Sequence, residues 1–123
     1  LGCRVVQRAL EVAPPAVAAH LAAELRGAVR PAARSLHANF VLQRLVQLLP
    51  AGPTGFVARE LAGRAVQTAC HITGCRVLCR LFERRSPPDA DTAELIREVL
   101  SSDLWKLCRH RFGCHVVVAI LEH

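Results

Sequence analysis

The sequence predicts an all-α solenoid, and three observations support this prediction. A short pattern that opens on a small residue recurs at intervals of 36, 36 and 39 residues, beginning at Gly2, Ala38, Gly74 and Gly113. An independent pattern, Glu-Leu-x-Gly, recurs at 24–27 and 60–63, again 36 residues apart. No stretch alternates polar and apolar residues as a half-buried strand would. A fixed period of roughly 20–50 residues is typical of arrays whose units bury their faces on each other.

Each unit is predicted to hold three helices. In the first unit they cover 2–12, 15–25 and about 28–36, separated by Pro14-Pro15 and by Gly27. Proline is well tolerated at the start of a helix and poorly in its interior, so the Pro pair ends one helix and opens the next.

The later units repeat this order. The predicted helices there are 38–49, 54–61, 64–70, 74–85, 93–100, 104–110 and 113–123. The loop 86–91 takes the three extra residues of the last interval, since a loop insertion costs little. Asp91 or Thr92 is expected to cap 93–100, and Ser102 or Asp103 the helix after it.

The five residues that follow each small residue form a pentad with a regular division of faces. The four pentads are 3–7, 39–43, 75–79 and 114–118. The first, second and fifth residues fall on one side of a helix, while the β-branched or Leu pair at the third and fourth positions turns toward the core. A solenoid would therefore present one such triplet per repeat along its concave wall. Two of the three side chains can meet a base edge while the middle one stacks on bases.

Composition is compatible with a nucleic-acid partner. The net charge is +6, and Lys106 is the only lysine among 16 basic residues. Arginine stacks on rings and forks onto phosphates, although a codon bias toward Arg explains the choice over Lys equally well. No apolar run spans a bilayer, and no secretion signal is visible. The chain lacks an initiator Met and opens within the pattern, so we expect it to be a piece of a longer protein.

The repeated stretches resemble the RNA-facing helix of Pumilio/FBF (PUF) repeats. The residues that carry the resemblance are 2–11, 38–44 and 110–117, with 120–123 closing the last helix. The resemblance implies a right-handed α-solenoid of three-helix, armadillo-like repeats, of which three to four are present. It also implies that 1–123 is part of a Pumilio-homology domain whose repeat helices begin near 2, 38, 74 and 113.

In the first two repeats the resemblance implies complete reading triplets. Cys3 and Gln7 would meet an adenine edge, with Arg4 stacking on bases. Asn39 and Gln43 are the pair associated with uracil, and Phe40 would stack.

The triplets of the third and fourth repeats depart from the pattern. In the third, Cys75 and Arg76 fit but Cys79 replaces the glutamine, and a thiol is a weak donor and acceptor. In the fourth, Cys114 and His115 remain while Val118 removes the second edge reader. The possible phosphate contacts recur just beyond the triplets, at Arg8, Arg44 and Arg80; solvated or internally paired arginines are the alternative.

The family binds RNA antiparallel to the protein chain. The resemblance therefore implies that, from the 5′ end, the RNA offers two loosely read nucleotides, then U, then A. The implied partner is single-stranded RNA, an mRNA 3′ untranslated region with a UA-containing element, with micromolar-class binding by this stretch alone. The resemblance further implies a cytoplasmic, monomeric, non-enzymatic regulator of mRNA without cofactor, metal or membrane, with protein partners on the convex face. Nuclear or nucleolar residence stays open.

Several alternatives remain at this point. A zinc site built on Cys70, His71 and the later cysteines lacks a tight Cys-x-x-Cys, and the thiols follow the repeat, which also argues against a cysteine nucleophile. Trp105 is expected to pack between repeats, and a base-stacking platform is the alternative for its indole. Charge-driven RNA binding in ribosome biogenesis and a protein-binding helical scaffold are the two competing functions.

Overall fold

The computed structural model describes residues 2–84 and 88–123, with side chains from Arg4 onward. This part of the chain is helical, and no strand occurs in it. The helices are α1 (Gly2–Val12), α2 (Pro15–Ala23), α3 (Val29–Ala33), α4 (Ala38–Leu48), α5 (Ala51–Leu61), α6 (Ala65–Ala69), α7 (Gly74–Phe82), α8 (Ala90–Leu100), α9 (Leu104–Arg109) and α10 (Gly113–Glu122). None of these helices is both long and apolar enough to cross a membrane.

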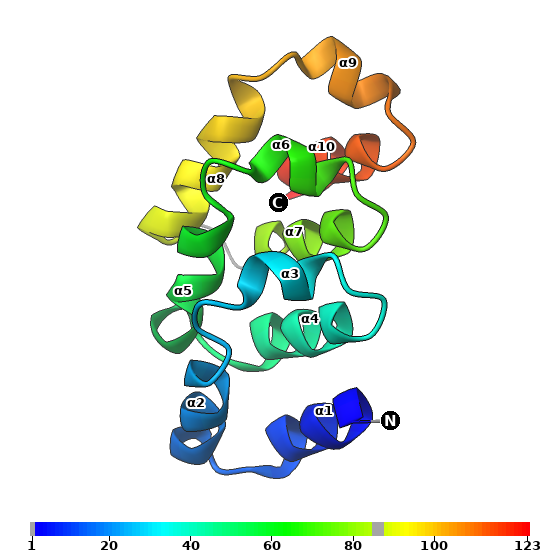
Figure 1. Ribbon diagram of the computed structural model, residues 1–123. Helices are drawn as coiled ribbons and strands as arrows, with labels where there is room; N and C mark the ends of the chain where they lie inside the picture. Colours follow the sequence, from blue (N-terminus) through cyan, green and yellow to red (C-terminus); the bar gives the residue numbers. More distant parts are fainter. Residues whose placement is uncertain (1, 85–87) are drawn as a thin grey trace.

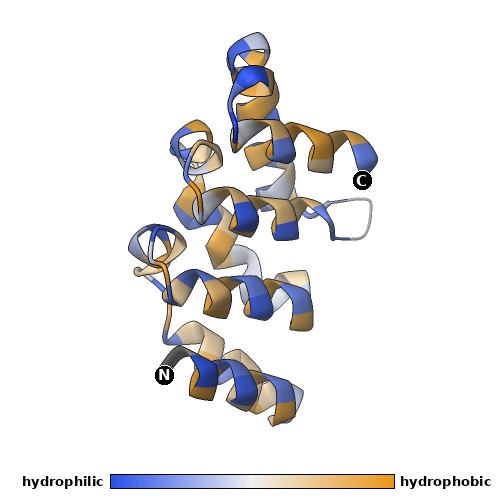
Figure 2. Ribbon diagram, turned by 90° about the vertical axis from the view of Figure 1, so that its right-hand side faces the viewer, coloured by the Kyte–Doolittle hydropathy of each residue, from blue (hydrophilic) through white to orange (hydrophobic). Residues whose placement is uncertain are grey.

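The helices stack in register, and the predicted solenoid is confirmed. Helices α1, α4, α7 and α10 lie side by side as a ladder, each in contact with the next. Figure 2 looks onto this ladder, whose outward side we call the ladder face. Helices α2, α5 and α8 form a second layer, and the short helices α3, α6 and α9 run along one edge (Figure 1). The core lies between the layers, with Leu42, Leu78 and Leu95 fully buried.

The glycines that open α7 and α10 are required by close packing. A Cβ atom on Gly74 would lie 2.6 Å from the carbonyl oxygen of Thr68 in α6. One on Gly113 would lie 2.5 Å from Cδ1 of Leu107 in α9. The short helices α6 and α9 therefore press directly on the starts of α7 and α10, and this contact explains the glycine at the first position of the pattern in these two helices.

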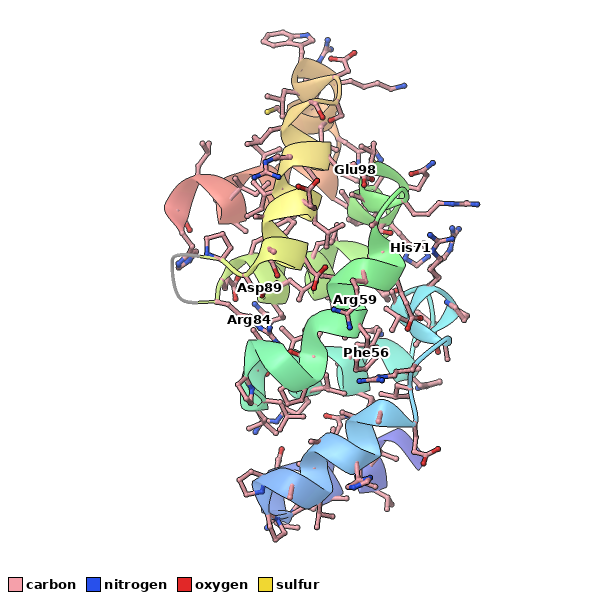
Figure 3. The ribbon with its side chains drawn as sticks, turned by 90° about the vertical axis from the view of Figure 1, so that its left-hand side faces the viewer. Phe56, Arg59, His71, Arg84, Asp89 and Glu98 are labelled. Atoms are coloured by element: carbon pink, nitrogen blue, oxygen red, sulfur yellow. The ribbon has the colours of Figure 1, made fainter. Side chains whose placement is uncertain are left out.

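Helices α4, α7 and α10 are capped from one equivalent position, three residues before the small residue. The hydroxyl oxygen of Ser35 accepts a bond of 3.1 Å from the N–H of Ala38. His71 and His110 do the same through Nδ1, each accepting a bond of 3.2 Å from the glycine that opens the helix. These bonds satisfy backbone donors that a helix start leaves without partners. His71, labelled in Figure 3, thus has a structural task.

Carboxylates of the second layer join neighbouring repeats. Glu60 of α5 accepts bonds from the N–H groups of Gly27 and Val29, at 2.8 and 3.2 Å. Glu98 of α8, labelled in Figure 3, accepts bonds from the N–H groups of Gly63 and Ala65, at 2.6 and 2.7 Å. Both glycines have positive φ, 85° and 83°, which turns their N–H groups toward the next repeat. The Glu of each repeat therefore holds the loop that precedes the short helix of the repeat before it.

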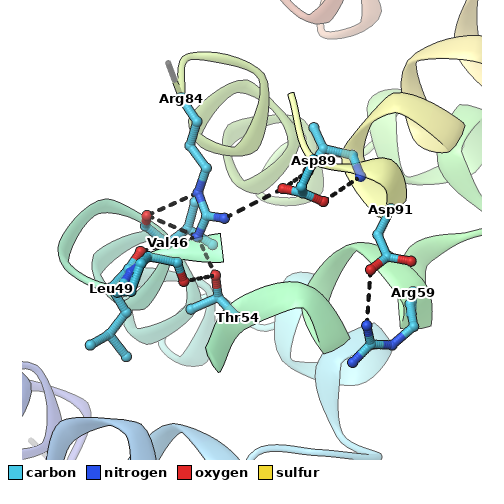
Figure 4. Close-up of polar contacts among 9 residues, drawn as sticks. Val46, Leu49, Thr54, Arg59, Arg84, Asp89 and Asp91 are labelled. Carbon is cyan, nitrogen blue, oxygen red and sulfur yellow. Dashed lines mark hydrogen bonds and ion pairs between the residues drawn. The ribbon is translucent and has the colours of Figure 1, made fainter. Parts of the chain in front are cut away.

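Arg84 joins the second and third ladder helices at their opposite end (Figure 4). Its Nε and Nη2 atoms donate to the carbonyl oxygen of Val46 at 3.2 and 3.1 Å, and Nη2 also donates to the hydroxyl of Thr54. Burial lowers the pKa of the Arg84 guanidinium, and the carboxylate of Asp89, 4.0 Å away, opposes that shift. The guanidinium satisfies carbonyls at the end of α4 that the helix itself leaves free.

The start of α8 differs from the prediction. Asp89 is its N-cap, and its carboxylate accepts bonds of 3.0 Å from the N–H and the hydroxyl of Thr92. Asp91 instead pairs with Arg59 of α5 at 2.9 Å (Figure 4). The predicted cap at Asp91 or Thr92 is therefore wrong by two or three residues, and residues 85–87 of the loop lie outside the described part. The predicted cap Asp103 is confirmed by its bond to the N–H of Lys106.

Two expectations about burial are also corrected. Trp105 is 74% exposed, with the guanidinium of Arg109 6.0 Å from its ring centroid, so it does not pack between repeats. The third and fourth pentad positions are buried in α4, α7 and α10, as predicted, but Val5 and Val6 of α1 are exposed. Helix α1 packs on α4 and α2, and the two valines lie on its remaining surface.

Candidate nucleic-acid interface

The middle residue of every triplet is exposed on the ladder face. These residues are Arg4, Phe40, Arg76 and His115, one from each ladder helix. Phe40 keeps 42% of its surface exposed, although an aromatic ring of this size is usually covered. Guanidinium, phenyl and imidazole groups are all planar and stack on bases. The structure thus offers one stacking group per repeat.

The two edge residues of the second repeat are bonded to each other. Nε2 of Gln43 donates a bond of 2.8 Å to Oδ1 of Asn39. The amide nitrogen of Asn39 donates in turn to the carbonyl oxygens of Ser35 and Leu36, at 2.7 and 3.1 Å. Asn39 is fully buried and Gln43 is 9% exposed. Asn39 therefore fixes the start of α4 and the orientation of Gln43, while Gln43 retains an amide oxygen and a second N–H hydrogen for a ligand.

The first repeat is described in part. Gln7 is half-buried and Arg4 exposed, which suits an edge reader and a stacker. The side chain of Cys3 lies outside the described part of the chain, so its predicted contact with an adenine edge stays a prediction.

The third and fourth repeats enclose a groove of about 500 Å³ between α7 and α10. We call it the thiol groove; its lining includes Cys75, Arg76, Cys79, Arg111, His115 and Val118. Cys75 is 5% exposed, and its Sγ donates to the carbonyl oxygen of Ile72 at 3.3 Å. Burial raises the pKa of the Cys79 thiol to about 11, with the neighbouring Cys75 thiol and Glu83 acting in the same direction.

The fourth triplet is the most divergent of the four. Its Cys114 is half-buried and donates weakly to the carbonyl oxygen of Arg111 at 3.7 Å. Val118, at the position of Gln43, is 48% exposed and has no polar side-chain atom. This repeat therefore brings a stacking group, His115, to the ladder face without a second edge reader.

The three repeated arginines beyond the triplets are held in ion pairs. Arg8 and Arg44 both bind Glu11, at 3.1 and 2.8 Å, and Arg80 binds Glu83 at 2.7 Å. The Arg44 guanidinium, followed by that of Arg8, lowers the pKa of the Glu11 carboxyl. A phosphate would have to exchange with these carboxylates, and the predicted phosphate contacts stay a proposal.

The described residues give no support to a metal site. No group of three or more His, Cys, Asp or Glu side chains among them is arranged to hold a metal ion. The cysteines from Cys70 onward are free thiols.

Sequence reasoning missed Arg111 as a residue of this face. It borders the thiol groove, and its guanidinium lies 5.0 Å from the ring centroid of Phe112. It stands outside the pentad, so the repeat pattern did not select it. The signal available in the sequence was the run His110-Arg111-Phe112, which stands directly before the glycine that opens α10.

The sequence matches the profile of the Pumilio-family RNA binding repeat over residues 1–26, 64–100 and 105–123. The segment 27–63, which holds the second repeat's triplet, lies outside these matches. No curated protein matches the chain significantly.

Solved structures with the same fold include RNA-bound proteins. The Puf3 RNA binding domain bound to Cox17 RNA 3′ UTR recognition sequence site A is 27% identical, with a TM-score of 0.89 over 98% of this chain. A double mutant of Puf4 bound to the Cox17 sequence is 26% identical, with a TM-score of 0.87 over 98% of the chain. PUF-8 in complex with PBE-RNA is 22% identical with a TM-score of 0.90 over 98%, which shows the fold alone. The chain spans 34%, 40% and 35% of these three proteins.

Proposed function

The chain belongs to the Pumilio-family RNA binding repeat proteins, and on this basis we propose that it binds single-stranded RNA with its ladder face, taking roughly one base per repeat. One observation supports this most strongly: an exposed planar stacking group stands on each of the four ladder helices. Stacking of this kind contributes about 1–3 kcal/mol per base and tolerates every base. Base preference then comes from the edge residues beside each stacker.

The four repeats contribute unequally to base preference. We assign adenine to the first repeat, through Cys3 and Gln7, and uracil to the second, through the amide of Gln43 in the orientation that Asn39 fixes. Antiparallel binding places these bases as 5′-UA-3′ at the 3′ end of the bound RNA. The two bases on the 5′ side face the third and fourth repeats and are held mainly by Arg76 and His115.

The role that follows is regulation of mRNA after transcription. Puf3 and Puf4 are described in complex with 3′ UTR recognition sequences, and we extend that class of target to this chain. We propose a non-catalytic protein that acts in the cytoplasm on transcripts with a UA-containing element. Partner proteins would dock on the second layer, which leaves the ladder face free for RNA. The chain spans about a third of the proteins it resembles, so the activity of the whole protein is part of this proposal.

Charge-driven binding is less well supported by the ladder face. Arg8, Arg44 and Arg80 are already paired with Glu11 and Glu83, so the repeated arginines present little free positive charge. The feature that favours a protein-binding scaffold is the loss of the edge-reading glutamine at Cys79 and Val118.

Titration of the chain with a short single-stranded RNA and with the same sequence as a duplex tests the proposal. We expect binding to the single strand at low salt and much weaker binding to the duplex, whose bases are already stacked and paired. No binding to any RNA at low salt would refute RNA binding and leave the scaffold function. Equal binding to both forms, with a steep salt dependence, would indicate binding driven by charge alone.

A further inference from the structure

The charged groups that line the thiol groove are divided between its two ends. Arg76 and His115 stand near the starts of α7 and α10, and Arg111 lies in the turn directly before α10. The carboxylates of the lining, Glu83 and Glu122, come from the opposite ends of the same two helices. The helical rise separates Arg76 from Glu83 by about 10 Å along α7. The groove therefore has a cationic end, formed by Arg76, Arg111 and His115.

The two guanidinium groups of the cationic end are not neutralised by a carboxylate. Neither Arg76 nor Arg111 takes part in an ion pair within residues 2–84 and 88–123. Both side chains are exposed, and the Arg111 guanidinium lies 5.0 Å from the ring centroid of Phe112. An arginine that contacts a ring with its face keeps the N–H groups in the guanidinium plane for a second partner. These two residues therefore offer paired donors to a ligand in the groove.

The groove holds more hydrogen-bond donors than acceptors. The third guanidinium of its lining, that of Arg80, donates from Nη1 to Glu83 at 2.7 Å. The Nε atom of Arg80 is nevertheless buried, and no atom in the described part of the chain accepts a bond from it. An anion supplies the acceptors that such a lining lacks. A phosphate diester suits it best, because its unesterified oxygens match the fork of N–H groups on a guanidinium.

The fourth repeat carries its arginine at the opposite end of the ladder helix from the other repeats. At the position of Arg80 it has Ala119, which has no charge. Two places before the small residue it has Arg111, where the second and third repeats have Leu36 and Ile72. Leu36 and Ile72 are exposed, so packing does not decide the residue type at this position. The change removes a cation from the end with the carboxylates and adds one to the cationic end.

We propose that the cationic end of the thiol groove binds one phosphate of the RNA backbone, held by Arg76 and Arg111 with His115 as a further donor. The inference rests on the proposed function, because the phosphate belongs to the RNA whose bases the ladder face binds. With antiparallel binding, it is the phosphate that joins the two nucleotides on the 5′ side of the UA pair. The third and fourth repeats then add affinity through the backbone, without a second edge reader for the base.

An uncharged linkage at that place in the RNA tests the proposal. The wild-type chain is titrated by fluorescence anisotropy with an all-phosphate RNA and with the same RNA carrying one methylphosphonate between the two nucleotides 5′ of UA. We expect the neutral linkage to weaken binding about threefold at low salt. The slope of log K against log salt should fall by about 0.7, the value for one phosphate of a single strand. A methylphosphonate within the UA pair is the control and should have a smaller effect, because the equivalent turn residue there is Leu36.

Arg111→Leu is the matched protein variant, since it gives the fourth repeat the residue type of Leu36. It should weaken binding of the all-phosphate RNA to the same extent as the neutral linkage does. The neutral linkage should then have no further effect on this variant, because both changes remove the same contact. Arg109→Ala removes an equal charge from an exposed residue of α9 that does not line the groove, and it should keep the full sensitivity to the neutral linkage. Circular dichroism checks that both variants keep their helical content.

The outcomes separate this inference from the proposed function. If the chain prefers UA but binds equally well with the neutral linkage 5′ of it, the inference is overturned and the function stands. A full effect of that linkage on folded Arg111→Leu, or equal effects of the neutral linkage at both places, would also overturn the inference. Absence of binding to every RNA would overturn the function, and the inference with it.

Discussion

Gln43 donates a hydrogen bond of 2.8 Å to Asn39, one helical turn earlier on the ladder face. Asn39 is anchored in turn to the backbone at the start of α4, so the orientation of Gln43 is fixed before any RNA binds. An amide held in one orientation presents its donor and acceptor to a base at a lower entropy cost than a free one. The amide of Gln43 is therefore preorganised for the base contact proposed above, and the other repeats place different residues at these two positions.

Gln43→Ala should relax the preference for uracil while leaving the fold intact. The edge reader is lost, but Asn39 keeps its bonds to Ser35 and Leu36. We expect discrimination between U and C at this position to fall by at least about fivefold. Gln47→Ala is the control, since Gln47 is exposed one turn later on the same helix. Unchanged discrimination in Gln43→Ala would show that this amide does not face a base.

Phe40→Ala should weaken binding to every RNA to a similar extent. The ring is 42% exposed, so its loss costs little stability, but a stacking contact of about 1–3 kcal/mol disappears. Arg4→Ala should behave alike and also lower the salt dependence slightly, because one positive charge is removed. Arg34→Ala, an exposed arginine at the end of α3, is the control for charge. If removing either side chain changed base preference and left overall affinity unchanged, that result would contradict the assignment of Phe40 and Arg4 as stacking groups.

Glu98→Ala should destabilise the solenoid. The carboxylate accepts two backbone N–H groups of the preceding repeat, at 2.6 and 2.7 Å, and its loss leaves both without a partner. We expect the free energy of unfolding to fall by about 1–3 kcal/mol. Glu94→Ala, on the same helix, removes only an exposed pair with Arg97 and should cost less than about 0.5 kcal/mol. Urea unfolding measures both, and equal effects would refute the proposed role of Glu98.

Gly74→Ala should also destabilise, for a steric reason. The new Cβ would lie 2.6 Å from the backbone oxygen of Thr68, so α6 or α7 must shift. A loss of about 1–3 kcal/mol is expected. Gly52→Ala is the matched control, because no atom lies within 4 Å of its Cβ position and alanine favours a helix. Thermal unfolding that ranks the two substitutions in the opposite order would show that the contact of α6 with α7 is not tight.

The solenoid could be predicted from the sequence because two independent patterns, the small-residue pattern and Glu-Leu-x-Gly, recur with the same period. The proposed stacking residues could also be placed on one face, since helical spacing alone decides which residues share a side. They are Arg4, Phe40, Arg76 and His115. Helical spacing wrongly predicted that Val5 and Val6 are buried, because burial depends on whether another helix covers that side. The prediction that Trp105 packs between repeats is wrong for a similar reason.

Contacts between repeats were largely beyond sequence reasoning. Glu60 and Glu98 bind backbone N–H groups more than thirty positions earlier, and a backbone donor has no residue type to recognise. The caps at His71 and His110 had a visible signal, a constant spacing before the glycine. The hydrogen bond from Gln43 to Asn39 fits an i, i+4 pair, whereas the bonds from the Asn39 amide nitrogen to the carbonyl oxygens of Ser35 and Leu36 required the structure.

Base reading by the first two repeats is tested most directly by one titration series. The chain is titrated at fixed salt with four short RNAs that differ only in the UA pair: UA, CA, UG and CG. We expect UA to bind most tightly, each single change to weaken binding by roughly five- to tenfold, and the two changes together to be about additive in free energy. Equal affinity for all four RNAs would contradict base reading by these two repeats.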